Sequence, residues 1–333
     1  MKKVLVFIFT LALLGLGWLV FGPSAKQNPG TTEQQRPAPL KVGTNIWVGY
    51  EPLYLAQSLG FYQDAGIELV EFSNATQVLQ AYKGGLIDVA ALTLDEVFVL
   101  QTMQEKPKIL LIVDFSNGAD SIIAQPQFPD IQSLADKRIG VENTAMGGFF
   151  LARAFQASGL SLDQLQIIPL SVGEHEQAYL ANRVDGLVTF DPTKSRLIKQ
   201  GAHEVFNSSQ IPGEIVDTLV ANDQVIDHYR PALTRLVQGW DQAVRYIQEH
   251  SKKAAQAISK RLKVEPKLVL ESYEGVKLIN AQENYQMMKD PGSSIYKALK
   301  ELPIFLQKKK LLTSAPETKH LLEPSLVQAV SQP

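Results

Sequence analysis

The sequence predicts an α/β protein of two lobes with a cleft between them, because one structural unit occurs twice. The paired stretches are KVGTNIWVG at 41–49 with IDVAALTLDE at 87–96, and RIGVENTAM at 138–146 with VDGLVTFDP at 184–192. Gly43 precedes Asp88 by 45 positions, and Gly140 precedes Asp185 by the same 45 positions. In both units short apolar strands alternate with helical segments, as in parallel α/β sheets. A cleft between two such lobes suits a small ligand.

Length and composition agree with this fold class. The 333 residues are enough for two domains, and 45% apolar with 20% charged residues is typical of a globular protein. The net charge of −2 gives no electrostatic reason to expect nucleic-acid binding. The sequence contains no cysteine, which excludes disulfides, thiolate metal sites, cysteine nucleophiles and the lipid-modified cysteine of lipoproteins.

The N-terminus has the pattern of a targeting segment. Lys2 and Lys3 precede an apolar run from Val4 to Gly22, whose length lies between that of a signal peptide and that of a membrane span. Residues 1–23 are therefore expected to be a signal peptide or an N-terminal membrane anchor, and both alternatives stay open. Residues 24–39 are polar and rich in Pro and Gln, which predicts a flexible linker. We expect an exported protein of the periplasm or cell envelope.

Lobe one is predicted to begin at residue 40 and to run to residue 120. Its expected strands are 41–47, 67–72, 87–92 and 109–115, and its expected helices are 54–61, 77–83 and 95–104. The continuous apolar run 87–92 is typical of a buried parallel strand. Gly84 and Gly85 end the second helix in the manner of a C-cap.

Lobe two is predicted to cover residues 121–215. Its first expected strand begins at residue 138, further strands are expected at 165–170 and 184–190, and its expected helices are 149–158, 174–182 and 193–200. A strand over 214–221 would leave this lobe. Residues 216–320 form the second part of lobe one, mainly helical, with helices at 229–250, 252–262, 266–279 and 294–302 and with no strands within this helical block. These helices need a sheet to pack on, so we place them on lobe one. The chain would cross between lobes twice, and 321–333 would be a C-terminal tail.

The loop after the first strand is the first candidate ligand-binding segment. Ligands of open α/β sheets bind beyond the carboxyl ends of strands, where Trp47, Gly49 and Tyr50 are expected. Gly49 lets the backbone approach a ligand, and the two aromatic rings offer flat apolar surface with a polar group. The alternative for Trp47 is simple packing in the core.

Three further loops carry polar residues at comparable places. Thr93 and Asp95 open a helix, where they could cap it, contact a ligand, or do both. Asn117 and Asp120 lie at the first expected crossing between lobes. In the second lobe a loop from Glu142 to Gly148, which contains Asn143, Thr144 and Ala145, leads into a helix N-terminus with free N–H groups.

Asp191 corresponds to Asp95 in the second unit. Together with Asp120 these carboxylates would give the cleft an acidic side. A buried carboxylate needs a partner, which could be an amino group of the ligand, Lys194 or a backbone cap.

Signatures of catalysis are lacking in the sequence. The five histidines have no metal-ligand spacing, and there is no Gly-x-Ser-x-Gly or Gly-x-Gly-x-x-Gly motif. We therefore expect a binding protein with no cofactor, no metal and no catalytic residues.

The segment KVGTNIWVGYEPLYLAQSLGFYQDAGIELV, followed by GGLIDVAALTLDE, VDFSNGADSIIA, SLADKRIGVE and VDGLVTFDP, resembles the substrate-binding proteins of nitrate/sulfonate/taurine ABC transporters, the SsuA/THI5-like or NMT1-like family. The resemblance covers roughly residues 40–315. It implies a type II periplasmic-binding-protein fold, a small polar solute between the lobes, a monomer, and delivery to an ABC permease with its ATPase. The family's binding loops map onto 47–50, 93–95, 117–120, 143–145 and Asp191.

Two departures from the family pattern bear on the ligand. Many relatives have Trp-Glu-Pro where this chain has Phe190, Asp191 and Pro192, and the binding loops contain no arginine to pair with a sulfonate. An amino-bearing or zwitterionic solute, or a heterocycle stacked on Trp47 or Tyr50, is therefore at least as compatible with the sequence as a sulfonate. Two other functions are open: a membrane-tethered ligand sensor of the same fold, and an enzyme similar to thiamine-pyrimidine synthases. The latter depend on a histidine and a cysteine-rich motif, whereas this chain has no cysteine.

Overall fold

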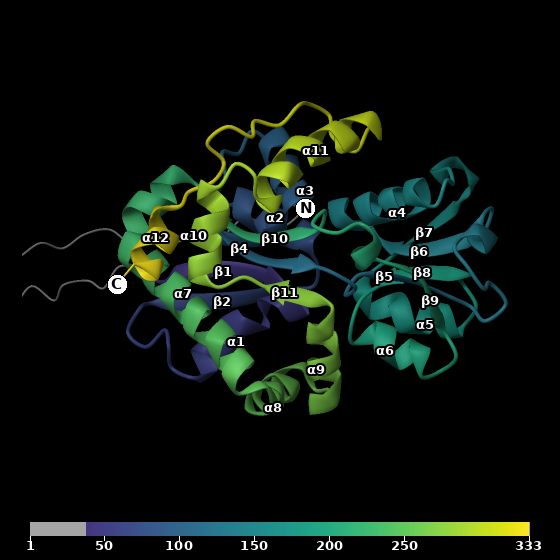
Figure 1. The fold of residues 1–333 in the computed structure, drawn as a ribbon, viewed down its shortest axis with the longest axis horizontal. Coiled ribbons are helices and arrows are strands. Elements are labelled where there is room, and N and C mark those ends of the chain that lie inside the picture. The colour runs from purple at the N-terminus through teal and green to yellow at the C-terminus, as the bar shows by residue number, and fades with distance from the viewer. Residues whose placement is uncertain (1–37, 333) are drawn as a thin grey trace, which may run out of the picture. The chain divides into compact units, whose positions relative to one another are not determined.

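The computed structural model describes residues 38–332, and the predicted targeting segment and nearly all of the predicted linker lie outside the described residues. Two sheets, each with its own helices, are visible in Figure 1. The first sheet has six strands in the order β11-β4-β10-β3-β1-β2, and the second has five in the order β7-β6-β8-β5-β9. The predicted mixed α/β fold class is confirmed.

The first sheet is formed by β1 (Leu40–Asn45), β2 (Ile67–Phe72), β3 (Val89–Thr93), β4 (Lys108–Ser116), β10 (Val216–Ala221) and β11 (Val276–Leu278). Strands β1, β2 and β3 are parallel, as predicted, but β10 is antiparallel to both β3 and β4. The expectation of a wholly parallel sheet is wrong here, because β10 returns from the second lobe in the opposite direction.

The second sheet is formed by β5 (Ser121–Ala124), β6 (Arg138–Glu142), β7 (Gln166–Leu170), β8 (Gly186–Thr189) and β9 (His203–Asn207). Strands β6, β7 and β8 are parallel, whereas β5 runs antiparallel to β8 and β9. Strands β5 and β9 were not predicted; they are short and adjoin the two crossings between the sheets.

The repeated unit of the sequence has a physical basis in the two aspartates that define its spacing. The Asp88 carboxylate accepts a hydrogen bond from the Lys41 backbone N–H at 2.8 Å, and Asp185 accepts one from the Arg138 N–H at 2.9 Å. Each aspartate thus fixes the loop before the third strand of its unit to the start of the first strand. Asp185 also pairs with the Arg138 guanidinium at 2.8 Å.

Helices of the first lobe are α1 (Glu51–Ser58), α2 (Ala75–Lys83), α3 (Leu94–Thr102), α7 (Asp223–Glu249), α8 (Ser251–Leu262), α9 (Pro266–Glu274), α10 (Ala281–Lys289), α11 (Ser294–Lys308) and α12 (Ser325–Ser331). Helices of the second lobe are α4 (Ala145–Ala157), α5 (His175–Leu180) and α6 (Thr193–Ile198). Short 3-10 turns occur at 48–50, 132–134, 162–164, 172–174 and 208–210.

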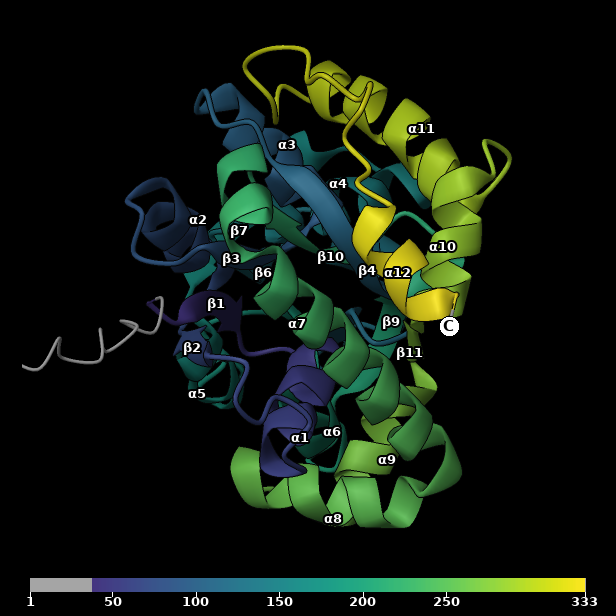
Figure 2. The ribbon, with the colours of Figure 1, turned by 90° about the vertical axis from the view of Figure 1, so that its left-hand side faces the viewer.

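The C-terminal helices pack on the first sheet, as expected, and Figure 2 shows α7, α10 and α12 together on this side of the molecule. Two expectations for this region are wrong. The helix predicted over 266–279 ends at Glu274, and β11 follows and pairs with β4. The predicted tail contains α12, which packs on α7 and α10 through buried Leu326 and Val327.

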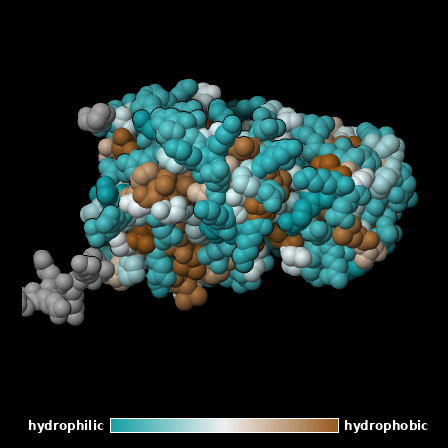
Figure 3. All heavy atoms as spheres, turned by 90° about the horizontal axis from the view of Figure 1, so that it is seen from below, coloured by the Kyte–Doolittle hydropathy of each residue, from teal (hydrophilic) through white to brown (hydrophobic). Residues whose placement is uncertain are grey.

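Apolar side chains are buried on both sheets. The largest buried side chains include Trp240 on α7, Phe98 on α3 and three phenylalanines of α4, Phe149, Phe150 and Phe155. On the face drawn in Figure 3, hydrophobic residues form separate patches within a mainly hydrophilic surface. The expectation of a monomer stays a prediction.

Candidate functional site

A small pocket with a volume of about 30 Å³ lies between the two sheets and is lined from both. The first lobe contributes the β1–α1 loop, the start of α2, the β3–α3 junction and β10, and the second lobe contributes the β6–α4 loop and the end of β8. Its lining residues are Asn45, Ile46, Trp47, Tyr50, Ala75, Thr93, Glu96, Asp120, Glu142, Thr144, Met146, Phe190, Ile215 and Asp217. The pocket thus occupies the carboxyl ends of the parallel strands, where α/β sheets bind ligands.

Aromatic rings from both lobes form part of the lining. Trp47 and Phe190 meet edge to face, with their ring centroids 5.6 Å apart. The Trp47 Nε1–H donates to Asp114 Oδ2 at 3.0 Å, and the Tyr50 hydroxyl donates to Asp217 Oδ1 at 2.5 Å. Both rings are therefore fixed in place at the pocket by buried carboxyl groups.

Asp114 and Asp217 are paired positions on the antiparallel strands β4 and β10. Side chains at paired positions project to the same face of a sheet, so the two carboxyl groups are neighbours. Burial raises the pKa of Asp114 to about 8, and the nearby charge of Asp120 adds to this effect. Burial also raises the pKa of Asp217 well above its usual range, with Asp114 as the next cause. At neutral pH the pair carries less than its full charge.

A second acidic group surrounds the start of α3. The Glu96 carboxylate accepts from the Thr93 backbone N–H at 3.0 Å, in the manner of a capping box. Burial raises the pKa of Glu96 to about 8, and the adjacent Asp95 carboxylate raises it further. Burial likewise raises the pKa of Asp95 to about 6. Capping of this helix is thus carried out by Thr93 and Glu96, while Asp95 Oδ2 has no hydrogen-bond partner among residues 38–332.

On the second lobe, Glu142 ends β6 and faces the same pocket. Burial raises the pKa of Glu142 to about 7, and its Oε1 has no partner in the described part of the chain. Thr144 caps α4, because its hydroxyl accepts from the Gly147 N–H at 3.1 Å. The Thr144 hydroxyl therefore occupies one of the N–H groups that were expected to be free at this helix N-terminus.

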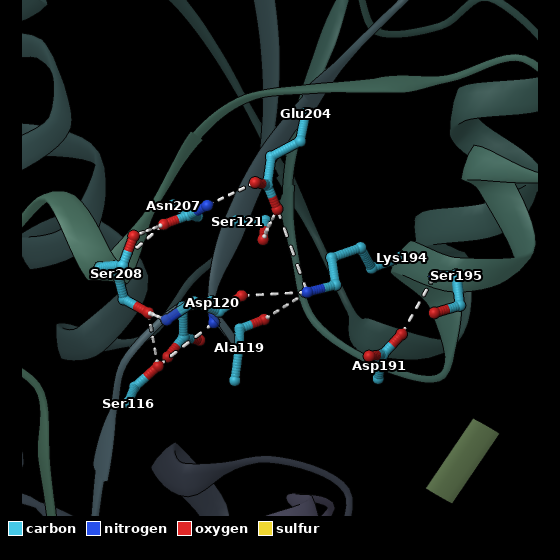
Figure 4. A network of polar contacts seen from close by, with 12 residues as sticks. Ser116, Ala119, Asp120, Ser121, Asp191, Lys194, Ser195, Glu204, Asn207 and Ser208 are labelled. Carbon is cyan, nitrogen blue, oxygen red and sulfur yellow. Dashed lines mark hydrogen bonds and ion pairs between the residues drawn. The ribbon is translucent and has the colours of Figure 1, made fainter. Parts of the chain in front are cut away.

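The crossings between lobes lie beside the pocket, and Figure 4 shows their polar network. The hydroxyls of Ser116 and Ser208 are 2.7 Å apart, and the Ser208 backbone N–H donates to the Asp120 carbonyl at 2.9 Å. Lys194 donates to the Gly118 carbonyl at 3.0 Å and lies 4.0 Å from the Glu204 carboxylate. Burial raises the pKa of Asp120 to about 6, against the opposing effects of Ser116 and Lys194. The two crossings are thus bound to each other at the pocket's edge.

Five of the predicted site residues line the pocket: Trp47, Tyr50, Thr93, Asp120 and Thr144. Gly49 lies behind it, where an added Cβ would be 1.9 Å from Asp114 Oδ2. Glycine is required at this position by the close approach of Asp114.

Five predicted site residues are not among the lining residues: Asp95, Asn117, Asn143, Ala145 and Asp191. The Asn117 N–H donates to the Gly275 carbonyl at 2.8 Å. The Asn143 carbonyl accepts from the Thr76 hydroxyl at 3.4 Å, a contact between the two lobes. Asp191 lines a separate small hollow and accepts from the Ser195 N–H at 3.0 Å. The partner of Asp191 in the structure is thus a backbone N–H group, as one of the expected alternatives had it. Lys194, another alternative, instead donates to the Gly118 carbonyl.

Four acidic residues of the site were not among the predicted site residues: Glu96, Asp114, Glu142 and Asp217, of which Glu142 had been placed in a candidate loop. The sequence does contain an indication for two of them. Asp114 and Asp217 interrupt the apolar runs ILLIVDFS and IVDTLVA, and a carboxyl group buried in such a strand is expected to have a partner or a function. Within residues 38–332, no group of three or more acidic, histidine or cysteine side chains has an arrangement suited to a metal ion.

Comparison with known proteins identifies the family. A family model described as the NMT1-like family matches residues 33–263. A relative named "Putative binding protein" from Brucella abortus (strain 2308) is 21% identical over 260 residues, which cover 76% of this chain and 80% of the relative.

Two solved structures show the same fold. The alkanesulfonate-binding protein SsuA from Xanthomonas axonopodis pv. citri, bound to MOPS, has a TM-score of 0.71 at 18% identity and covers 86% of this chain and 98% of its own. The periplasmic nitrate-binding protein NrtA from Synechocystis PCC 6803 has a TM-score of 0.69 at 16% identity and covers 89% of this chain and 88% of its own. Since the family model matches well over half of its residues, this chain belongs to the NMT1-like family.

Proposed function

We propose that this protein is an extracytoplasmic solute-binding protein that holds a small polar organic solute between its two lobes and delivers it to the permease of an ABC importer. The observation that carries the proposal is the pocket itself, which is lined from both lobes and combines aromatic with acidic side chains. SsuA and NrtA, which share the fold, are named for binding alkanesulfonates and nitrate. Fold alone does not determine a ligand, so the solute is argued from the residues of this pocket.

Closure of the lobes on a solute is supported by contacts that cross the pocket. The edge-to-face contact of Trp47 with Phe190 joins the β1–α1 loop to the end of β8. The Thr76 hydroxyl donates to the Asn143 carbonyl at 3.4 Å and joins the start of α2 to the β6–α4 loop. A solute between the lobes would touch both sides, so its binding would favour the closed arrangement over an open one.

Export to the periplasm or cell envelope is part of this proposal. It rests on the apolar N-terminal segment of the sequence and on the periplasmic location given in the name of NrtA. Across residues 38–332, none of the helices combines the length and apolar character of a membrane span. Fractionation of cells that express the full chain tests the location, and finding it only in the cytoplasm would refute this part.

Solute binding can be tested through Trp47, whose ring lines the pocket, whereas Trp240 is fully buried on α7. The full chain is titrated with sulfonates, amines, amino acids and pyrimidines, and tryptophan fluorescence and melting temperature are recorded. A binding solute is expected to change the fluorescence and raise the melting temperature. The Trp47→Phe variant should lose the fluorescence change. A solute that changes the fluorescence equally in the variant would bind elsewhere and contradict the proposal.

A further inference from the structure

We propose that the solute held in this pocket is a small organic cation, such as a protonated amine, a quaternary ammonium ion or a protonated nitrogen heterocycle. This inference rests on the proposed function and specifies the chemistry of the same site. It sets the chain apart from relatives named for anionic solutes. The observations that carry it are the charge of the lining, the absence of cationic partners, unpaired buried oxygens and the aromatic rings.

The charge of the pocket lining has one sign. Four lining side chains carry carboxyl groups, namely Glu96, Asp120, Glu142 and Asp217, and Asp114 on β4 is the strand partner of Asp217 on β10. No lysine, arginine or histidine is among the lining residues of the described chain. A sulfonate, nitrate or carboxylate placed here would meet the charge of Asp120, whose pKa is about 6, and would find no cationic side chain in the lining to pair with.

Nearby basic side chains are occupied elsewhere. Lys194 binds the Gly118 carbonyl, and Arg261 forms ion pairs with Glu51 and Glu71. Among residues 38–332, none of the ion pairs involves a carboxyl group of the pocket lining. Lys194 lowers the pKa of Asp120 but is not within ion-pair distance of it, and in the described part of the chain Glu96, Glu142 and Asp217 have no ion-pair partner either. A cationic solute would provide one.

Unpaired oxygen atoms give an independent indication of a missing donor. Asp114 is fully buried, and its Oδ1 has no hydrogen-bond partner in the described chain although its Oδ2 holds the Trp47 indole. Asp95 is 3% exposed and its Oδ2 is likewise unpaired, as is Glu142 Oε1 in the pocket lining. Buried acceptors without partners are rare in native proteins, and Glu142 Oε1, which belongs to the pocket lining, is an acceptor that an N–H group of a solute would satisfy.

The aromatic rings complete a site for a cation. Trp47, Tyr50 and Phe190 lie in the same lining as the four carboxyls. The negative face of an aromatic ring attracts a cation, most strongly for tryptophan, and several rings around one pocket suit ammonium groups. Met146 adds an apolar contact, so the pocket fits an organic cation better than a hydrated metal ion.

Protonation provides a consequence that an anion would not share. In the solute-free pocket, burial holds the pKa of Glu96 and Asp114 at about 8 and that of Glu142 at about 7. The groups facing them are Asp95, Asp120, Asp217, Tyr50 and, at the crossing, Lys194. A bound cation favours the ionised carboxylates, so binding releases protons. Affinity should therefore increase from pH 6 to pH 8, by up to about tenfold per pH unit for each proton released.

Matched probes of opposite charge test the inference. The full chain is titrated at pH 6, 7 and 8 with ethanolamine, choline, benzylamine and 4-aminopyridine, and with isethionate and phenylmethanesulfonate as anions of similar shape. Melting temperature and Trp47 fluorescence report binding. We expect the cations to bind and to bind more tightly at pH 8 than at pH 6, with no binding of the anions.

Two charge-removing variants and one control identify the site. Asp120→Asn and Glu142→Gln should each weaken binding of the tightest cation by about tenfold or more. Glu176→Gln removes the same charge from the surface pair with Arg196 and should change affinity less than twofold. Melting temperatures of the free variants show that they fold.

The outcomes separate this inference from the proposed function. If the sulfonates change Trp47 fluorescence and the cations do not, the solute is an anion and the inference is overturned while solute binding between the lobes stands. If neither class binds, both fail. Cation binding that Glu142→Gln, Asp120→Asn and Glu176→Gln all leave unchanged would place the cation outside this pocket and overturn the inference.

Discussion

Gly49 offers a sharp test of how the pocket is built. Replacing it with alanine would place a Cβ 1.9 Å from Asp114 Oδ2 and 2.3 Å from Trp47 Nε1, the two atoms of the hydrogen bond that holds the Trp47 ring. Moving either side chain away would disturb its packed surroundings, because Asp114 is fully buried and Trp47 is nearly so. The substitution should therefore break this hydrogen bond and displace the β1–α1 loop.

The magnitude follows from two costs. At neutral pH the pKa of Asp114, about 8, leaves the group mostly uncharged, so the lost hydrogen bond costs about 1 kcal/mol. The steric displacement in a packed region costs about 1–3 kcal/mol. Together they destabilise the fold by about 2–4 kcal/mol. At about 2 °C per kcal/mol, the lower end of the range for proteins of some 200 residues, the melting temperature should fall by about 4–8 °C.

The assay is thermal unfolding by circular dichroism together with Trp47 fluorescence. Gly173→Ala is the matched control, because an added Cβ meets nothing within 4 Å there. The control should keep the melting temperature within about 1 °C, since surface changes of this kind are nearly neutral. If Gly49→Ala matches the control in both melting temperature and fluorescence, the contact between Gly49, Asp114 and Trp47 does not fix the loop, and the reasoning is wrong.

Three further predictions concern the pocket and its surroundings. The Asp114 pKa of about 8 lies above the unfolded value of about 4, so the folded form binds more protons between these values and this group's contribution to stability falls as pH rises. Between pH 5 and pH 8 the difference is about 3–4 kcal/mol, so Asp114→Asn should raise the melting temperature about 7 °C more at pH 8 than at pH 5, and an equal effect at both pH values would count against it. Asp191→Asn should weaken the cap on Ser195 and cost about 1 kcal/mol, seen in urea unfolding, while solute affinity changes less than twofold; a larger loss of affinity would place Asp191 in the site. Phe305→Leu on α11 should lose its ring contact with Phe149 of α4, at 5.6 Å, and lower the melting temperature by about 2 °C, whereas Ile304→Val at the exposed neighbouring position should not.

Local patterns in the sequence were sufficient to predict most of the fold. The paired spacing of Asp88 and Asp185 predicted two related units, and both aspartates make the same backbone hydrogen bond. Residues after predicted strands, such as Trp47 and Thr144, do line the pocket. These successes share a cause: strand ends are defined by local apolar runs and by their flanking loops.

The failures have a different cause, because they depend on contacts far apart in the sequence. Asp114 and Asp217 meet only because β10 returns beside β4 from the second lobe, which no local pattern reports. Strand β11 has only three residues and is stabilised by pairing with β4. The sequence pattern therefore predicted a continuous helix over 266–279, which includes the residues of this strand. Asp191 matched Asp95 by position in the repeat, yet its carboxylate caps its own helix. Equivalent positions in a repeat need not point to the same place.

Strands β4 and β10 have one further consequence for motion between the lobes. They are antiparallel neighbours, and the chain leaves the end of β4 and returns to the start of β10 through segments joined by Ser116 and Ser208. In terms of connectivity, the whole second lobe is the enlarged loop of a single β-hairpin. A rotation of that loop would twist the neck of the hairpin first. Asp114 and Asp217 lie opposite each other at this neck. A rotation of the second lobe would therefore change the distance between the two carboxyl groups, and with it their pKa values.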